Sequence, residues 1–237
     1  MYRDTIGVLG GFGGYATLHF MERFLEVFAS EKESNYPHIF FDNDFTMPSR
    51  TRALLYGERY EEIVREIAAG IRRFDESGVS YVILACGTAH VFLEDVYAVY
   101  PSARKLVMNI IDACGEELVD KKVRSAAVIA AEGTLKYKQY SKQWNGLDIE
   151  IEEPDESRYD EIRFFIEAVK QNNLNQGAAD KFIRFLKGFK SRNIILGCTE
   201  FPQLVRFIHA SGVDGLREYT FYNPLESVLW KLKATIK

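Results

Sequence analysis

Short apolar segments alternate with amphipathic helical stretches along nearly the whole chain, and this alternation constrains the fold more than any other feature. Between Tyr60 and Phe74, for example, apolar side chains recur every three or four positions, as one buried face of a helix requires. Gly78 then marks the expected end of that helix. Strands separated by helices predict parallel βαβ units, and therefore an α/β fold.

The same patterns give approximate positions for the elements. We expect strands over residues 6–9, 39–41, 79–85, 126–130, 149–151 and 193–196. We expect helices over 18–28, 60–74, 160–171, 178–189 and 225–236, and a loop over 42–52.

Two cysteines occupy closely similar positions in this pattern. Cys86 follows the apolar run Tyr81 to Ala85, and Cys198 follows Asn193 to Gly197. In open α/β sheets ligands bind beyond the carboxyl ends of the strands, so both thiols are expected at a functional edge. A buried cysteine is more often a small packing residue, and we interpret Cys114, which lies in a helix-like stretch, in that way.

The spacing of the two cysteines indicates the domain organisation. They lie 112 positions apart, about half of the chain. We therefore expect two similar parallel-sheet, flavodoxin-like domains that face each other across a central cleft, with one thiol on each side. The predicted domains are residues 1–105 together with a C-terminal return over about 215–237, and residues 106–214.

Composition excludes several classes of protein. The net charge of −4 argues against a nucleic-acid-binding protein, and no apolar run approaches the length of a membrane span. Three cysteines without framework spacing argue against a disulfide scaffold and fit a reducing cytoplasm, and the N-terminus lacks the pattern of a signal peptide. We expect no metal site, because the chain has no C-x-x-C pair and no histidine cluster.

A glycine-rich loop follows the first predicted strand. Its Gly11-x-Gly13-x-x-Ala16 pattern matches a short dinucleotide-binding fingerprint, although the acidic residue expected about 20 positions later would have to be Asp42, which comes late. The alternative is a tight turn between strand and helix that requires glycine conformations. The hypothesis that the chain is an oxidoreductase that binds a dinucleotide therefore stays open at this point.

Several motifs occur in the chain in a fixed order. They are Gly10-Gly11-Phe12-Gly13-Gly14-Tyr15-Ala16-Thr17, Pro48-Ser49-Arg50-Thr51, Cys86-Gly87-Thr88-Ala89-His90, Gly133-Thr134 and Gly197-Cys198-Thr199-Glu200. Together they resemble the aspartate/glutamate racemase family, and its aspartate racemases most closely. The resemblance implies a cofactor-independent enzyme that interconverts the L and D forms of an acidic amino acid, and commonly a homodimer.

That family uses two thiols, which the resemblance assigns to Cys86 and Cys198. One thiolate removes the α-proton, and the opposite thiol returns a proton to the other face of the carbon. A free thiol has a pKa of about 8.5, so we expect a nearby cation or a helix start to lower the pKa of at least one of them.

The remaining candidates surround the thiols. Arg50 is expected to clamp a substrate carboxylate, with an exposed loop arginine as the alternative. Gly11, Gly87, Thr88, Thr134 and Thr199 are expected to contact the substrate, although the threonines have helix N-capping as an alternative role. His90 and Glu200 either orient the thiols or form local bonds only.

Three positions depart from the family pattern. Gly87 replaces the usual asparagine, Asn223 stands where many members have an aspartate, and Arg158 is the candidate for a basic residue missing before the long helix of the second half. The alternatives are therefore a cysteine-dependent isomerase or decarboxylase of a dicarboxylate, and a protein that binds a small acid without turnover.

Overall fold

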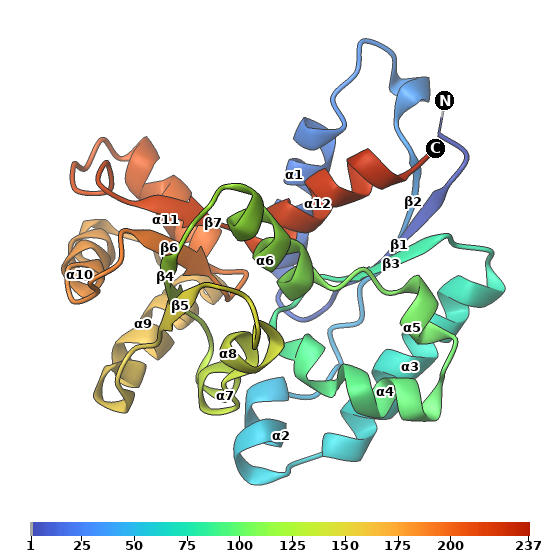
Figure 1. Cartoon of the computed structure of the whole chain (residues 1–237), viewed down its shortest axis with the longest axis horizontal. Coiled ribbons are helices and arrows are strands. Elements are labelled where there is room, and N and C mark those ends of the chain that lie inside the picture. Colours follow the sequence, from blue (N-terminus) through green and yellow to red (C-terminus); the bar gives the residue numbers. More distant parts are fainter. Residues whose placement is uncertain (1) are drawn as a thin grey trace.

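The structure is a computed structural model that describes residues 2–237, and it contains two parallel β-sheets (Figure 1). The first sheet has the order β2-β1-β3, and the second has the order β5-β4-β6-β7. The strands are β1 Thr5–Leu9, β2 His38–Asp42, β3 Tyr81–Leu84, β4 Ser125–Ile129, β5 Glu150–Glu152, β6 Asn193–Leu196 and β7 Thr220–Tyr222. All neighbouring strands are parallel. The predicted fold class is confirmed.

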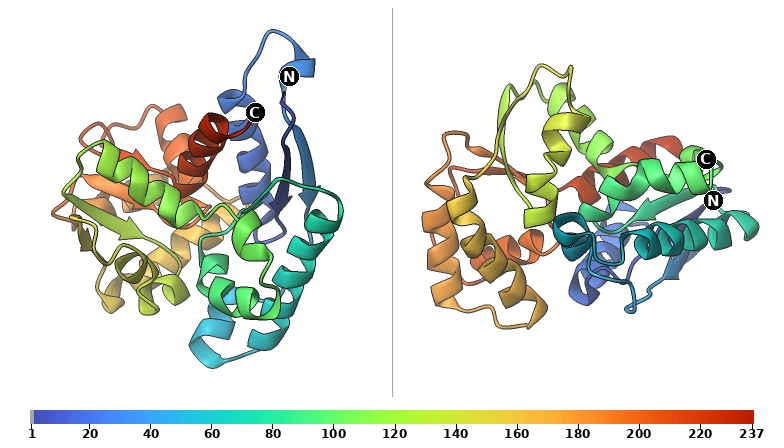
Figure 2. Two further views of the ribbon diagram at one scale, coloured as in Figure 1. Left: turned by 45° about the vertical axis from the view of Figure 1, so that its right-hand side comes forward. Right: turned by 90° about the horizontal axis from the view of Figure 1, so that it is seen from below.

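Helices cover both sheets, and the two halves lie side by side in all three views (Figures 1 and 2). The longer helices are α1 Gly14–Val27, α3 Tyr60–Glu76, α6 Ile110–Asp120, α9 Tyr159–Lys170, α10 Gln176–Leu186, α11 Phe201–Ala210 and α12 Pro224–Thr235. The short ones are α2 Arg50–Tyr56, α4 Leu93–Val99, α5 Ala103–Leu106, α7 Glu132–Lys136, α8 Gln139–Gln143 and the 3₁₀ turns Glu33–Asn35, Thr88–Phe92 and Glu156–Arg158.

The amphipathic stripe of α3 forms as the sequence predicts. Ile63, Ile67 and Ile71 are fully buried on one side of this helix. Gly78 adopts φ +75° just after the last turn, a conformation that glycine reaches without steric cost. The stripe therefore holds α3 against the first sheet.

The prediction of a loop over 42–52 is wrong for its last residues, because α2 already begins at Arg50. The side chain of Ser49 caps this helix by accepting a hydrogen bond from the backbone N–H of Arg52 at 3.3 Å. Gly57 closes the helix in the left-handed region. Arg50 is thus held on a helix start rather than on a flexible loop.

The hydrophobic core joins the two halves. Ile6 and Val8 of β1 face a large cluster that also contains Ile129 and Ile195 of the second sheet. Leu9 faces a smaller cluster with α3 on the other side of the first sheet. Because side chains alternate along a strand, β1 contributes to both clusters. The shared cluster fixes how the two sheets lie relative to each other.

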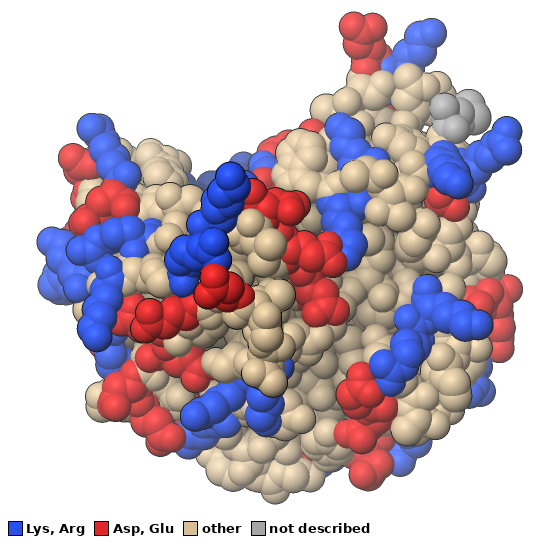
Figure 3. Space-filling view, viewed as in Figure 1, with Lys and Arg blue, Asp and Glu red and all other residues tan. Residues whose placement is uncertain are grey.

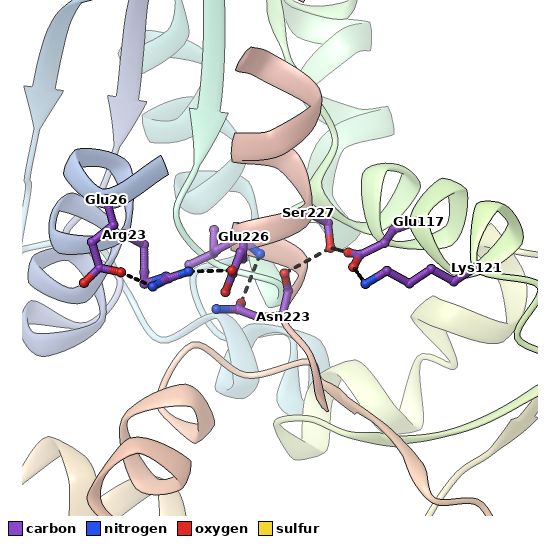
Figure 4. A network of polar contacts seen from close by, with 8 residues as sticks. Arg23, Glu26, Glu117, Lys121, Asn223, Glu226 and Ser227 are labelled. Carbon is purple, nitrogen blue, oxygen red and sulfur yellow. Dashed lines mark hydrogen bonds and ion pairs between the residues drawn. The ribbon is translucent and has the colours of Figure 1, made fainter. Parts of the chain in front are cut away.

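The C-terminal segment also connects the halves. Strand β7 pairs with β6 in the second sheet, whereas α12 packs against both α1 and α6. Figure 4 shows the polar contacts of α12: Glu226 pairs with Arg23 of α1, and Ser227 donates a hydrogen bond to Glu117 of α6 at 2.6 Å. Asn223 caps α12 by accepting from the N–H of Leu225 at 3.1 Å. The division into domains at about residue 105 stays a prediction.

Charged side chains of both signs are interspersed over the face of the molecule drawn in Figure 3. None of the helices within residues 2–237 is both long enough and apolar enough to cross a bilayer.

Candidate active site

The two predicted thiols line one cavity. Strand β3 ends two residues before Cys86, and β6 ends two residues before Cys198, so both cysteines follow the carboxyl ends of their strands. The cavity has a volume of about 240 Å³, and we call it the thiol cavity. Its lining also includes Arg50, Thr88 and Thr199. The third cysteine, Cys114, is fully buried in α6, as predicted for a packing residue.

The two cysteine-bearing segments approach each other closely. A Cβ atom added to Gly87 would lie only 2.5 Å from the carbonyl oxygen of Gly197. The backbone at Gly87 has φ −57°, which any residue adopts, so the constraint is steric and comes from the opposite segment. An asparagine could not occupy this position without moving the two segments apart.

Cys198 contacts an acidic side chain. Its thiol donates a hydrogen bond to Oε2 of Glu200 at 2.9 Å, and Glu200 is only 4% exposed. Burial raises the pKa of Cys198 well above its ordinary value, and the neighbouring Glu200 carboxylate raises it further. A helix start was expected to help lower the pKa of at least one thiol; at Cys198 the pKa is raised instead, and α11 begins only at Phe201.

His90 supports the segment that carries Cys86 but does not reach the thiol cavity. Its Nδ1 donates to the backbone carbonyl of Cys86 at 2.8 Å, and its Nε2 accepts from the N–H of Ile110 at 3.4 Å. These two bonds require the neutral imidazole. Burial lowers the pKa of His90 to about 4, so the ring stays neutral at physiological pH. His90 therefore holds the Cys86 turn against the start of α6.

Arg50 enters the thiol cavity without an ion-pair partner among the described residues. Its guanidinium donates to the carbonyl oxygens of Phe12 at 2.6 Å and Pro48 at 2.9 Å and lies over the Phe12 ring. Within residues 2–237 no acidic side chain forms an ion pair with Arg50, and its buried Nε has no hydrogen-bond partner. A cation oriented by backbone carbonyls is prepared to bind a carboxylate.

The three threonines differ in their exposure to the thiol cavity. Thr88 lines it and forms a hydrogen bond of 2.8 Å with the hydroxyl of Thr134, which is 1% exposed and lies behind it. Thr199 also lines the thiol cavity and donates to Glu200 at 3.3 Å. None of the three caps a helix in the described residues: the cap positions of the adjoining elements are Gly87, Ala131 and Glu200.

Gly11 does not line the thiol cavity. It lines an adjoining hollow of about 260 Å³ together with Lys170 and Glu200. Its φ of +79° and the backbone of Asp44, 2.0 Å from any added Cβ, leave room only for glycine. The glycine-rich loop is therefore a tight turn packed against the segment after β2. The substrate contact expected at Gly11 stays a prediction.

Arg158 does not supply the missing basic residue. Its guanidinium stacks on the rings of Phe185 and Phe189, 4.0 and 4.8 Å from their centroids, and donates to the carbonyl oxygen of Phe185. It is absent from the residues that line the thiol cavity. The expectation that it substitutes from a shifted position is wrong, because its guanidinium is held against Phe185 and Phe189 instead.

Two other cations of α9, Arg163 and Lys170, line the thiol cavity instead. Arg163 pairs with Glu132 and Asp160, and Lys170 lies 3.5 Å from Glu167. Positions 163, 167 and 170 follow the spacing of one helix face, so this face could have been recognised from the sequence once α9 was assigned. In the described residues no group of three or more potential ligands is arranged to hold a metal ion.

The fold resembles that of solved racemases. An aspartate racemase from Picrophilus torridus superimposes with a TM-score of 0.81 at 21% identity, covering 99% of this chain and 95% of that one. An aspartate racemase homologue from Pyrococcus horikoshii gives a TM-score of 0.76 at 20% identity, covering 98% of both chains.

Sequence comparison gives a similar result. A broad-specificity amino-acid racemase from Bacillus subtilis is 24% identical over 178 residues, which is 72% of this chain and 73% of that protein. A glutamate racemase from Thermoanaerobacter pseudethanolicus is 26% identical over 210 residues, covering 86% of this chain and 70% of that protein. The Asp/Glu/Hydantoin racemase family matches residues 9–215. The resemblance inferred from the motifs is confirmed, and the chain belongs to the Asp/Glu/Hydantoin racemase family.

Proposed function

We propose that this chain is an amino-acid racemase that works without pyridoxal phosphate or another cofactor and acts on an acidic amino acid. One observation carries the proposal: Cys86, Cys198 and Arg50, which has no ion-pair partner among the described residues, line the same cavity of about 240 Å³. Such a volume suits a small metabolite and is below the range of drug-sized pockets, which disfavours a dinucleotide.

In the proposed reaction Arg50 holds the α-carboxylate of the substrate. One thiolate takes the proton from Cα, and the electron pair of the broken C–H bond stays on Cα beside the carboxylate. The opposite thiol then donates its proton to the other face of that carbon and becomes the thiolate. The charge moves from one cysteine to the other, and the reverse reaction restores it.

The two thiols begin this cycle in different states. Because burial and Glu200 raise the pKa of Cys198, this cysteine starts as the proton donor, which assigns the base to Cys86. Reaction of the opposite enantiomer needs the exchanged state, in which Cys198 is the thiolate and Cys86 carries the proton. Glu200, 2.9 Å from the sulfur of Cys198, is placed to take the proton from Cys198, and Cys86 gains one from solvent.

The α9 face supports an acidic substrate. Besides Arg50 the thiol cavity is lined by Arg52, which pairs with Glu58, and by Arg163 and Lys170 of α9, which offer positive charge to a second carboxylate. Each of these α9 cations already has an acidic partner in the free protein, so a substrate carboxylate would have to replace Glu132 or Glu167. Lys170 has the more distant of these partners and is the easier cation to recruit.

Thiol substitutions separate this reaction from the alternatives. Cys86→Ser and Cys198→Ser are each expected to lower racemisation of aspartate or glutamate by roughly 100- to 10,000-fold, the usual range for loss of a general acid or base. The matched control is Cys114→Ser, which should leave turnover unchanged. Chiral chromatography measures turnover in all three variants. Full turnover in Cys86→Ser or in Cys198→Ser would contradict the proposal.

Two alternatives remain distinguishable. A cysteine-dependent isomerase or decarboxylase of a dicarboxylate would depend on only one of the two thiols and would exchange no α-proton. A binding protein without turnover is favoured by the raised pKa of Cys198, because a permanently protonated thiol cannot act as a base. Thermal stabilisation by an amino acid without conversion would identify it.

We further propose a cytoplasmic location, since both thiols must stay reduced to work.

We also propose a homodimer that forms through strand β2, the outer strand of the first sheet. Its Phe40 and Phe41 are 37% and 36% exposed. Antiparallel pairing of two β2 strands about Phe40 would place His38 opposite the partner's Asp42, whose carboxylate can accept a hydrogen bond from the imidazole. Light scattering should give twice the mass of one chain, and Phe40→Lys should halve it; a monomeric wild-type protein would contradict this interface.

A further inference from the structure

A buried hydroxyl without a partner lies beneath the thiol cavity. Tyr140 of α8 is 1% exposed, and its ring packs edge-on against Trp144 with centroids 5.2 Å apart. Within residues 2–237 its hydroxyl forms no hydrogen bond, whereas the neighbouring Trp144 donates to the carbonyl of Ile111 at 3.1 Å. Buried phenol groups nearly always have a hydrogen-bond partner, and leaving one unpaired is destabilising. A phenylalanine would pack here without that cost.

The hydroxyl of Tyr140 lies where the two cysteine-bearing segments meet. An atom added as Cβ at Gly197 would be 2.9 Å from it, and one at Gly87 would be 3.8 Å from it. Gly197 directly precedes Cys198, and Gly87 directly follows Cys86. The absence of side chains at both glycines gives this hydroxyl its position between the two segments.

The electrostatic surroundings keep the hydroxyl protonated. Burial raises the pKa of Tyr140 well above its ordinary value, and the thiols of Cys114, Cys198 and Cys86 raise it further, since a phenolate would be repelled by nearby thiolates. Tyr140 therefore offers a donor that does not ionise, beside two groups that must carry a negative charge in turn.

We propose that Tyr140 is a positioning residue whose hydroxyl donates a hydrogen bond to whichever cleft cysteine is the thiolate. The inference rests on the proposed racemisation, in which the charge moves between Cys86 and Cys198. In the resting protein neither sulfur accepts a hydrogen bond from this hydroxyl. The bond therefore forms when the segment that carries the charged cysteine shifts toward Tyr140 and the O–H turns to that sulfur. The tyrosine keeps its proton throughout, and only the α-proton and the thiol protons are transferred. The unpaired hydroxyl of the resting protein is the donor held for the charged state.

The test is Tyr140→Phe, which removes one oxygen atom and keeps the ring. We expect a melting temperature equal to or above that of the wild type, because a buried unpaired hydroxyl is removed. We also expect the thiols to titrate at higher pH and turnover to fall by roughly 10- to 100-fold in both directions with little change in KM, the effect of losing a hydrogen bond to a charged group.

The matched control is Tyr219→Phe. Tyr219 is also buried, at 7% exposure, and its hydroxyl also lacks a partner in the described part of the chain, but it lies beside β7 and does not line the thiol cavity. Both variants are made with Cys114→Ala, so that iodoacetamide alkylation followed by mass spectrometry reports only Cys86 and Cys198. Tyr219→Phe should leave thiol titration and turnover unchanged.

Unchanged thiol titration in Tyr140→Phe would overturn the proposal, and so would a melting temperature well below that of the wild type, which would show that the hydroxyl only stabilises the fold. The alkylation profile does not require turnover. A shifted profile in a protein that racemises nothing would therefore refute the proposed function while supporting the position assigned to Tyr140.

Discussion

Replacing Gly87 with alanine tests whether the close approach of the two cysteine-bearing segments sets the geometry of the reaction. The new Cβ would lie 2.5 Å from the carbonyl oxygen of Gly197. An ordinary contact between these atoms is at least about 3 Å, and the obstacle is backbone rather than a flexible side chain. The segments must therefore separate by roughly 0.5 to 1 Å.

Two effects of different size should follow. Overpacking of this kind typically costs about 1–3 kcal/mol of folding free energy, which urea unfolding measures. A displacement near 1 Å of reacting groups can reduce turnover by about 100-fold, so we expect kcat to fall far more than the stability loss alone explains. Turnover is measured by chiral chromatography at a temperature where the variant is fully folded.

The matched control is Gly188→Ala. Its Cβ would also clash, at 2.7 Å from the guanidinium of Arg158, but at a site remote from the thiol cavity. This variant should lose no more stability than Gly87→Ala and should keep wild-type kcat. If Gly87→Ala kept full turnover while losing stability, the separation of the two segments would not control the reaction, and the reasoning would be refuted.

Three further predictions concern other groups of the site. Burial lowers the pKa of His90 to about 4 from an ordinary value of 6.5, so its contribution to stability is present above pH 6.5 and is lost as the pH falls toward 4; at about 1.4 kcal/mol per pKa unit this amounts to roughly 3 kcal/mol. Urea unfolding from pH 7.5 to 4.5 should therefore show a steeper loss in the wild type than in His90→Gln, and parallel profiles would contradict this. Arg50→Lys keeps the positive charge but loses the planar guanidinium group that can donate two hydrogen bonds to one carboxylate. It should raise the KM for the amino acid by roughly 10- to 100-fold in steady-state kinetics. Lys170→Met should raise KM for an acidic substrate, whereas the control Arg158→Met should lower only the melting temperature; equal kinetic effects would refute the recruitment of Lys170 by the second carboxylate.

The positions of the thiols could be predicted because they depend on local patterns. Apolar runs before Cys86 and Cys198 identify strands, and parallel strands bring their carboxyl ends to one edge of each sheet. The pairing of the two halves across one cavity then follows from the repeated motif. Strand β7 was missed because Thr220–Tyr222 is only three residues long, too short to show a pattern of its own.

Long-range contacts could not be predicted in the same way. The raised pKa of Cys198 depends on how deeply the thiol and Glu200 are buried, and local sequence does not indicate that depth. The requirement for glycine at position 87 comes from Gly197, in a different half of the molecule. The direction of Arg158 is set by stacking on two phenylalanines of the helix α10 region. Each of these depends on residues that meet only after folding.

The most direct test of the proposed two-thiol reaction is proton NMR in D₂O under reducing conditions, starting from single enantiomers of aspartate and glutamate. The account predicts that the α-proton signal of at least one amino acid disappears while the opposite enantiomer accumulates with deuterium at Cα. It also predicts that Cys86→Ser and Cys198→Ser each slow this conversion by roughly 100-fold or more. Retention of the α-proton in all four enantiomers, or full conversion by either variant, would contradict it.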